Sequence, residues 1–452
     1  MSPIRRVATG LALCAALLVS SGCTASTAPD PPSGPIEPIV AGAPHDPTTI
    51  TVWSFNRLPN EVAAFRSALD RLEAAYPWLT VEFVENKDDA AFAQAVAGGN
   101  PPDVFISGAP DNVAKFCHNG TVSDLGPYLS AAGVDVAATF PAATLVYTQY
   151  QGKQCALPLL TDVYSLFYNK LIFAEAGITA PPRTLSELTE VAKKLTVFNP
   201  DGTVARFGFV PRSDYSGNGY LYAGVVSGTQ FYGPDGKATL GSDPRWAELL
   251  RWSKELTDFY GPGQVDNFVA TYQSHTDDAE NPLLTGKVAM EFDGEWHIGE
   301  NAEFNPGLDY GIAPMPLLDS EVANYGAGPA LGTVAYLPAG SQHQREAAFA
   351  IQQLTTDTQF LHTLADTVFN VPTTFESLRT WDKNTDEHWK PVIDIFAHPG
   401  SYYRGLTPAG AEDFDVFAKF IQSYELGQVP DLDAGLDGVA ADIDALNARS
   451  GS

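Results

Sequence analysis

The sequence has few residues of several kinds, and each shortage excludes a class of protein. Its 452 residues include only 4 cysteines and 8 histidines, and no His or Cys cluster has the spacing of metal ligands, so we expect neither a metal site nor a cofactor. Lysine and arginine number 26 against 54 aspartates and glutamates, which leaves a formal net charge of -28. A chain this acidic, without a basic stripe, repels phosphate backbones, so we expect no nucleic-acid partner.

Common catalytic motifs are missing as well. The sequence has no GxSxG nucleophile elbow and no HExxH metallopeptidase motif. Two carboxylates, Asp162 and Glu295, could in principle act as the acid and base of a glycoside hydrolase. Because the motifs are missing, we do not expect an enzyme. An exported glycoside hydrolase that uses Asp162 and Glu295 is the catalytic alternative.

Long apolar runs are also scarce. The run Leu11 to Val19 follows Arg5 and Arg6 and is too short to span a bilayer, which is typical of a signal peptide. It ends in SSGC, which resembles a bacterial lipobox, although Ser20 stands where the usual leucine would be. We therefore predict a lipoprotein signal peptide at 1–22 and a lipid anchor at Cys23. Ordinary cleavage that leaves a free cysteine is the alternative.

The segment after Cys23 lacks apolar periodicity. Residues 23–47 are rich in Pro, Ser, Thr and Ala, a composition that predicts a disordered tether. A lipidated cysteine on such a tether would hold a soluble body at a membrane surface.

Two cysteines remain once Cys14 and Cys23 are assigned to the leader and the anchor. In an exported protein, Cys117 and Cys155 indicate one disulfide. Two buried free thiols are the alternative.

The body of the chain alternates between strand and helix patterns. At 452 residues, 44% of them hydrophobic, it is long enough for two or three domains of roughly 150 residues each. Alternating elements predict an α/β fold with a largely parallel sheet. The first predicted strands are 49–55, 79–84 and 103–107, and the first predicted helices are 60–76, 88–97 and 112–118.

One later strand ends in an unusual group of side chains. The stretch AMEFDGEWHIG, from Ala289 to Gly299, begins as an apolar strand and then places Asp293, Glu295 and Trp296 around a glycine. Small molecules bind at strand ends in α/β folds. A tryptophan face beside carboxylates suits a ligand that is partly apolar and partly rich in hydroxyl groups.

Four segments, in order, resemble a known family. They are GNPPDVFISGAPDNVAKFCHNGTVSDLGPYL, GKQCALPLLTDVYSLFYNKLIFAEAGI followed by PPRTLSEL, LLTGKVAMEFDGEW, and AAFAIQQLTTDTQFLHTLADTVFNVPTT. Together they resemble the extracellular solute-binding proteins of family 1, which are the maltose-binding-protein-like subunits of carbohydrate ABC importers. The resemblance runs from about residue 48 to the end of the chain.

The resemblance implies a two-lobed periplasmic-binding-protein fold of type II, with discontinuous lobes and the ligand in the cleft between them. Lobe 1 would comprise 48–156 plus 288–337, and lobe 2 would comprise 157–287 plus 338–452. Hinge crossovers would let the lobes close.

The implied function is that of a monomeric, non-catalytic importer subunit, anchored by lipid at the extracytoplasmic face of a bacterial cell membrane. It would bind a neutral or amino sugar, from a mono- to a trisaccharide, and deliver it to the permease. A glycerophosphodiester is the alternative ligand. It is less favoured, because Arg57 and Arg404 are the only basic residues among the candidates.

The resemblance also implies the ligand contacts. Trp296 would stack on a sugar ring, while Glu295 and Asp162 would accept hydrogen bonds from hydroxyl groups. A core role for Trp296 and a turn role for Glu295 stay open, as does a helix N-cap role for Asp111. The other candidates are Thr161, Asn56, Arg57, Gly108, Asn112, Asn218, Tyr220, Gly326, Gly328, Tyr403 and Arg404.

Overall fold

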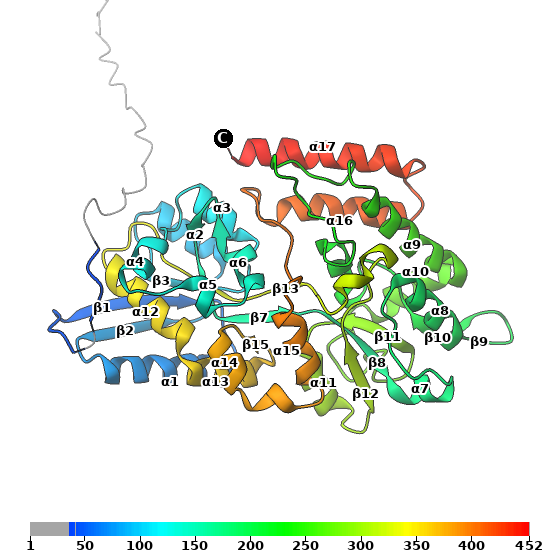
Figure 1. Cartoon of the computed structure of the whole chain (residues 1–452), viewed down its shortest axis with the longest axis horizontal. Coiled ribbons are helices and arrows are strands. Elements are labelled where there is room, and N and C mark those ends of the chain that lie inside the picture. Colours follow the sequence, from blue (N-terminus) through cyan, green and yellow to red (C-terminus); the bar gives the residue numbers. More distant parts are fainter. Residues whose placement is uncertain (1–35, 41, 452) are drawn as a thin grey trace, which may run out of the picture.

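Two α/β lobes, joined by a small sheet between them, make up the molecule (Figure 1). The structure is a computed structural model that describes residues 36–40 and 42–451. The two-lobed α/β prediction is confirmed. The signal peptide predicted at 1–22 and the lipid anchor at Cys23 lie outside the described residues.

The first lobe is built on a five-stranded sheet with the order β2-β1-β3-β14-β6. β1 (Thr48–Ser54) runs parallel to β2 (Leu79–Val84) and β3 (Val104–Ser107). β14 (Val334–Tyr336) lies between β3 and β6 (Leu157–Pro158) and is antiparallel to both. Every residue of β3 is buried, because this strand has neighbours on either side and helices over it.

Helices cover the first sheet. α1 (Pro59–Ala75) buries Phe65, Leu69 and Leu72 at helical spacing and packs against α13 (Thr358–Val368). α12 (Gln344–Thr356) contacts β1, β3 and β14. The other elements of this part are α2 (Asp89–Ala97), α3 (Asn112–His118), α4 (Gly126–Ala131), α5 (Val136–Thr139), α6 (Ala142–Thr148), β4 (Gln149–Tyr150), β5 (Lys153–Gln154) and α14 (Phe375–Thr380).

The second lobe is built on a sheet with the order β12-β8-β11-β10-β9. β11 (Val288–Asp293) is central and wholly buried, with β8 (Ser165–Asn169) antiparallel on one side and β10 (Val204–Phe209) parallel on the other. β12 (Tyr310–Ala313) and β9 (Val197–Phe198) form the edges. Its other elements are α7 (Lys170–Glu175), α8 (Leu185–Leu195), η1 (Ser216–Ala223), α9 (Pro244–Tyr260), α10 (Pro262–Tyr272), α11 (His297–Phe304), η2 (Asp319–Asn324), η3 (Asp382–Thr385), α15 (Trp389–Ala397), α16 (Glu412–Glu425) and α17 (Leu432–Ser450).

Three short strands form the connecting sheet, which is seen between the two lobes in Figure 1. β7 (Leu160–Val163) is its central strand and pairs antiparallel with β13 (Ala330–Leu331) and β15 (Val371–Pro372). The chain therefore passes between the lobes more than once, and each passage adds a strand to the same hinge.

The predicted lobe boundaries are partly wrong. Residues 288–337 were assigned to lobe 1, but β11 and β12 pair with β8 in the second sheet, and β14 alone joins the first sheet. Residues 338–452 were assigned to lobe 2, but α12 and α13 pack against α1 in the first lobe. The local sequence of a short apolar strand does not indicate which sheet the strand will join, because its partner strands lie far away in the sequence.

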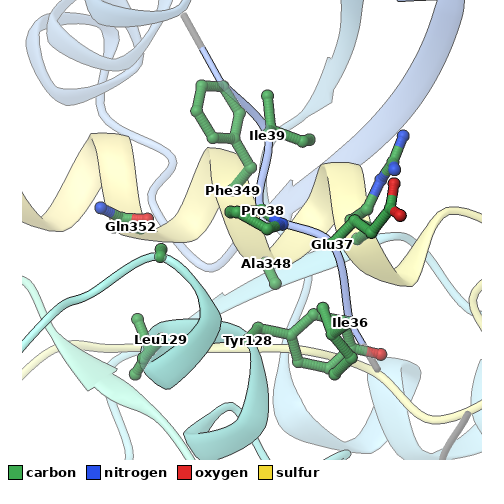
Figure 2. A pocket seen from close by; sticks show the side chains of 11 residues that line it. Ile36, Glu37, Pro38, Ile39, Tyr128, Leu129, Ala348, Phe349 and Gln352 are labelled. Atoms are coloured by element: carbon green, nitrogen blue, oxygen red, sulfur yellow. The ribbon is translucent and has the colours of Figure 1, made fainter. Parts of the chain in front are cut away.

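The last part of the predicted tether lies against the first lobe. Figure 2 shows Ile36, Pro38 and Ile39 beside the side chains of α4 and α12, with which they line a shallow pocket. Farther along, the His45 ring stacks on Trp78 with centroids 4.6 Å apart. Within the predicted tether, residues 36–39 and His45 thus lie against the surface of the first lobe.

The predicted disulfide is confirmed. Cys117, in α3, is bonded to Cys155, just after β5, and their Cα atoms are 5.7 Å apart. Among the residues that the structure describes, no helix combines the length and apolar character needed to cross a bilayer.

Candidate functional site

A pocket of about 300 Å³ opens beside the connecting sheet, at the carboxyl end of β11. This volume is in the range of pockets that hold small ligands. Aromatic side chains and carboxylates make up much of its lining: Tyr164, Tyr220 and Trp296, and Asp214, Asp277 and Asp293. The remaining lining residues are Ser216, Gly217, Gln273 and Thr276.

The aromatic residues of the pocket are packed against one another. The rings of Tyr164 and Tyr220 are stacked with centroids 3.5 Å apart, and Trp296 meets Tyr164 edge-on at 5.5 Å. Trp296 is half-buried, so part of its ring remains open to the pocket. Its ring folds back over Gly294, where an added Cβ would lie only 2.1 Å from the indole. The glycine after Asp293 is therefore needed for this position of the tryptophan.

The three carboxylates of the pocket differ in their surroundings. Asp293 is buried and accepts hydrogen bonds from the backbone N–H of Gly294 at 2.8 Å and from the Ser216 hydroxyl at 3.2 Å. Burial raises the pKa of Asp293 to about 8. Asp214 bonds to Arg212 at 2.9 Å, whereas Asp277 is exposed and has no hydrogen bond or ion pair with the described residues.

Behind Asp293 lies a fully buried histidine surrounded by carboxylates. His297 Nδ1 is 3.0 Å from Glu300 and 3.5 Å from Asp293, and its Nε2 is 3.5 Å from Glu291. Burial opposes a charge on His297, but the hydrogen bond with Glu300 and the charges of Asp293 and Glu291 outweigh it and raise its pKa to about 9. Glu291, Asp293 and His297 are close enough to be considered as metal ligands. However, the two ring nitrogens face different carboxylates, an arrangement that suits an imidazolium with two donors.

Three predicted ligand residues lie in the hinge. Glu295 is buried and accepts hydrogen bonds from Val163 N–H at 2.6 Å and from Asn370 at 2.8 Å. The same Asn370 amide also donates to Asp162 at 2.6 Å, and Thr161 donates to the Leu331 carbonyl of β13 at 3.1 Å. Burial raises the pKa of Asp162 to about 7, and burial followed by the charge of Asp162 raises the pKa of Glu295 well above its usual value. These groups hold the connecting strands together, and none lines the pocket.

Asp111, Tyr403 and Arg404 lie where the lobes meet. Arg404 is almost wholly buried and binds Asp413 of α16 and, at 2.6 Å, Asp111 at the start of α3. Burial raises the pKa of Asp111, although Arg404 opposes the shift. The Tyr403 ring is 6.4 Å from that of Tyr220, which connects this ion pair to the pocket. Asp111 makes no hydrogen bond as an N-cap, so its carboxylate serves the contact between lobes.

Most of the other polar candidates are already bonded within their own lobe. Asn218 is buried and donates to the carbonyls of Val210 and Arg212. Asn112 donates to Asp89 at 2.6 Å, and buried Asn56 accepts from the Ser54 hydroxyl at 2.7 Å. The side chain of Arg57 is exposed at the end of β1.

The candidate glycines allow close packing. An added Cβ would lie 2.9 Å from the Phe55 ring at Gly108, 3.1 Å from His398 at Gly326, and 2.6 Å from Ile395 at Gly328. Phe55 is exposed at the carboxyl ends of β1 and β3, and sequence reasoning had not selected it.

Several pocket residues were missed from the sequence. Tyr164 stands two positions after the candidate Asp162, and the candidate Tyr220 belongs to a tyrosine-rich segment, residues 213–224. Within that segment Tyr220 lines the pocket, while Tyr215 and Tyr222 are in the core. Asp277 lies in a loop that carries no motif, and Asp214 is a single acidic residue at the start of the tyrosine-rich segment, so only the folded chain brings the two together at the site.

Comparison with known proteins finds a family match. The model of a family described as bacterial extracellular solute-binding protein matches residues 58–357. A maltotriose-binding protein of Pyrococcus abyssi is 26% identical over 349 residues, which cover 76% of this chain and 70% of that protein. An uncharacterized lipoprotein of Streptomyces antibioticus is 29% identical over 194 residues, which cover 41% of this chain and 39% of that protein.

A solved structure is similar over nearly the whole described chain. The structure of CpMnBP1 with mannobiose bound superposes with a TM-score of 0.72 and 27% sequence identity. The match covers 87% of this chain and 99% of that chain.

Proposed function

Because the chain belongs to the bacterial extracellular solute-binding proteins, we propose that it captures a carbohydrate outside the cell and delivers it to the permease of an ABC importer. The ligand is a neutral or amino sugar of one to three rings. The mature protein is a monomer, held at the extracytoplasmic face of the membrane by a lipid on Cys23. A relative described as a lipoprotein and relatives described with bound or cognate sugars support this proposal.

The observation that carries the proposal is the pocket at the end of β11. Its stacked aromatic rings can pack against the C–H surface of a pyranose, and its carboxylates can accept hydrogen bonds from hydroxyl groups. The ion pair between Asp111 and Arg404 lies nearby and joins the lobes, as a closing cleft requires.

The alternatives have less support. Asp162 and Glu295 share the Asn370 amide in the hinge, whereas the acid and base of a glycoside hydrolase must flank the scissile bond in the substrate site. A glycerophosphodiester would need a cation for its phosphate, but within residues 36–40 and 42–451 no Lys or Arg lines the pocket.

A thermal-shift screen tests the proposal. The mature chain is heated with neutral sugars, amino sugars and glycerophosphodiesters, because a ligand that binds only the folded state raises the melting temperature. We expect a shift with a sugar that is recovered chemically intact after incubation. Cleavage of the sugar would instead show an enzyme. An unchanged melting temperature with every sugar would contradict carbohydrate binding.

A further inference from the structure

We propose that the pocket selects sugars that carry a protonated amino group, and that Asp277 and Asp214 hold the ammonium. This inference rests on the proposed function and narrows its substrate class. It follows from the charge and the hydrogen-bonding state of the groups that line the pocket.

The charge of the pocket lining is of one sign. Asp214, Asp277 and Asp293 line it, and in the described part of the chain no Lys or Arg does. Asp277 is exposed and unpaired among the described residues, so its carboxylate is free to meet a ligand. Carboxylates can accept hydrogen bonds from hydroxyl groups, but only a cationic donor also neutralises their charge.

The nearest arginine, Arg212, neutralises only part of this charge. Arg212 is shared among Asp214 at 2.9 Å, Asp266 at 2.5 Å and Glu425 at 3.4 Å. Each contact uses a different nitrogen of the guanidinium, so one positive charge faces three carboxyl groups. Asp214 Oδ1 is buried and has no hydrogen-bond partner among the described residues. Buried oxygens without a partner are rare in folded proteins, and a donor from the ligand would satisfy this one.

Asp293 has a different part in the site. Its oxygens are occupied by the Gly294 N–H and the Ser216 hydroxyl, and His297 lies 3.5 Å behind it. The ammonium therefore meets Asp214 and Asp277, while Asp293 fixes the turn that carries Trp296. An ammonium has three donors and no acceptor, which matches a pair of carboxylates with free oxygens.

The aromatic residues complete the recognition of a cation. Trp296 and Tyr220 line the same pocket as the carboxylates, and aromatic faces attract a cation within about 6 Å of the ring centre. The same faces pack against the sugar ring. A sugar ring with an ammonium group thus contacts both the aromatic side chains and the carboxylates of the lining.

Matched sugars that differ at one carbon test the proposal. The affinity of the mature chain is measured by calorimetry for glucosamine, N-acetylglucosamine and glucose, and for the β-1,4-linked disaccharides of the same three sugars. Galactosamine, N-acetylgalactosamine and galactose form a further set with another ring stereochemistry. We expect the amine of a set to bind at least tenfold more tightly than its neutral counterparts, with a preference that shrinks as salt rises.

A single variant assigns the preference to the pocket. Asp277→Asn keeps the size of an exposed side chain that has no partner, so it should fold normally and reduce the amine preference at least threefold. Asp442→Asn makes the same charge change on the exposed face of α17 and should leave the preference unchanged.

The outcomes separate this inference from the proposed function. Neutral sugars that bind as tightly as the amines would overturn the inference and leave carbohydrate binding intact. An amine preference that survives Asp277→Asn would overturn the assigned residues and so the inference as stated. If no sugar in the sets or in the thermal-shift screen binds, both the inference and the proposed function would be overturned.

Discussion

At the scale of single residues, the position of Trp296 is the feature on which binding depends most. Gly294 leaves room for the indole to fold back, and Tyr164 supports the ring edge-on. A ligand ring that covers the open part of the indole would bury apolar surface on both sides.

Removal of this ring should weaken binding without unfolding the protein. In Trp296→Ala we expect about thirtyfold lower affinity for the sugar found in the screen, since the stacked surface contributes about 2 kcal/mol. Titration calorimetry measures the change. Trp78→Ala is the control, because Trp78 is on the first lobe against His45 and outside the pocket. Equal losses in the two variants would contradict a specific role for Trp296.

His297 should make the stability depend on pH. Its pKa is raised from 6.5 to about 9, because its hydrogen bond with Glu300 and the neighbouring carboxylates outweigh the effect of burial. The folded state therefore holds a proton that the unfolded state loses above about pH 6.5. This stabilisation is complete below pH 6.5 and disappears as the pH rises through about 9.

We thus expect the free energy of unfolding to fall between pH 6.5 and 9 by about 1–3 kcal/mol. Urea unfolding at several pH values measures the slope. NMR titration, with His297→Gln to assign the signal, reports the histidine itself. A histidine that is neutral at pH 7.5 would contradict this account.

Only part of the site could be predicted from the sequence. Trp296 follows a strand directly, so its place at a strand end is a local property. The structural role of Glu295 in the hinge depends on a hydrogen bond from Asn370, which is 75 positions away, and no local sequence pattern indicates that contact. The unpaired state of Asp277 likewise depends on which neighbours the fold supplies.

At the scale of elements, strands and helices of the first lobe were predicted nearly residue by residue. β1, β2, β3, α1, α2 and α3 all lie within a residue or two of the expected ranges. Periodicity and turn residues are local, which is why they suffice here. The assignment of β11 and β12 to the wrong lobe shows the limit, because the pairing of a strand is not a local property.

The disulfide between α3 and the end of β5 should contribute measurably to stability. It closes a loop with a sequence separation of 38, which corresponds to about 2–4 kcal/mol in the chain-entropy account. We expect reductant to lower the urea midpoint of the mature chain, and the variant with Cys117→Ala and Cys155→Ala to be equally destabilised. Reductant should not change that variant. An unchanged midpoint for the reduced natural chain would contradict a stabilising role.

At the scale of the whole molecule, one face of α3 carries contacts between the lobes. Asp111, Lys115 and His118 are about one helical turn apart, and they meet Arg404, Glu412 and Gly451 respectively. Arg404 is fixed to the second lobe through Asp413. Closure of the two lobes should therefore depend on this face.

Asp111→Asn should weaken ligand binding by favouring separated lobes. Loss of the charge-assisted bond to Arg404 would reduce affinity about three- to tenfold, which is about 1 kcal/mol. Calorimetry gives the affinity, and small-angle scattering with saturating ligand gives the separation of the lobes. Asp442→Asn serves as the control for the change in charge. Unchanged affinity and unchanged scattering in Asp111→Asn would show that the pair does not hold the closed state.

The discontinuous first sheet also has a consequence for how the chain is made. β14 is the neighbour of both β3 and β6, yet it is translated more than two hundred residues after β3. Until residues 334–336 emerge from the ribosome, one edge of β3 has no partner, and α12 and α13 are not yet present to cover α1. Such late closure of distant contacts slows folding. The nascent chain would thus stay unfolded through most of its synthesis, which is the state in which a protein can be threaded through a narrow export channel.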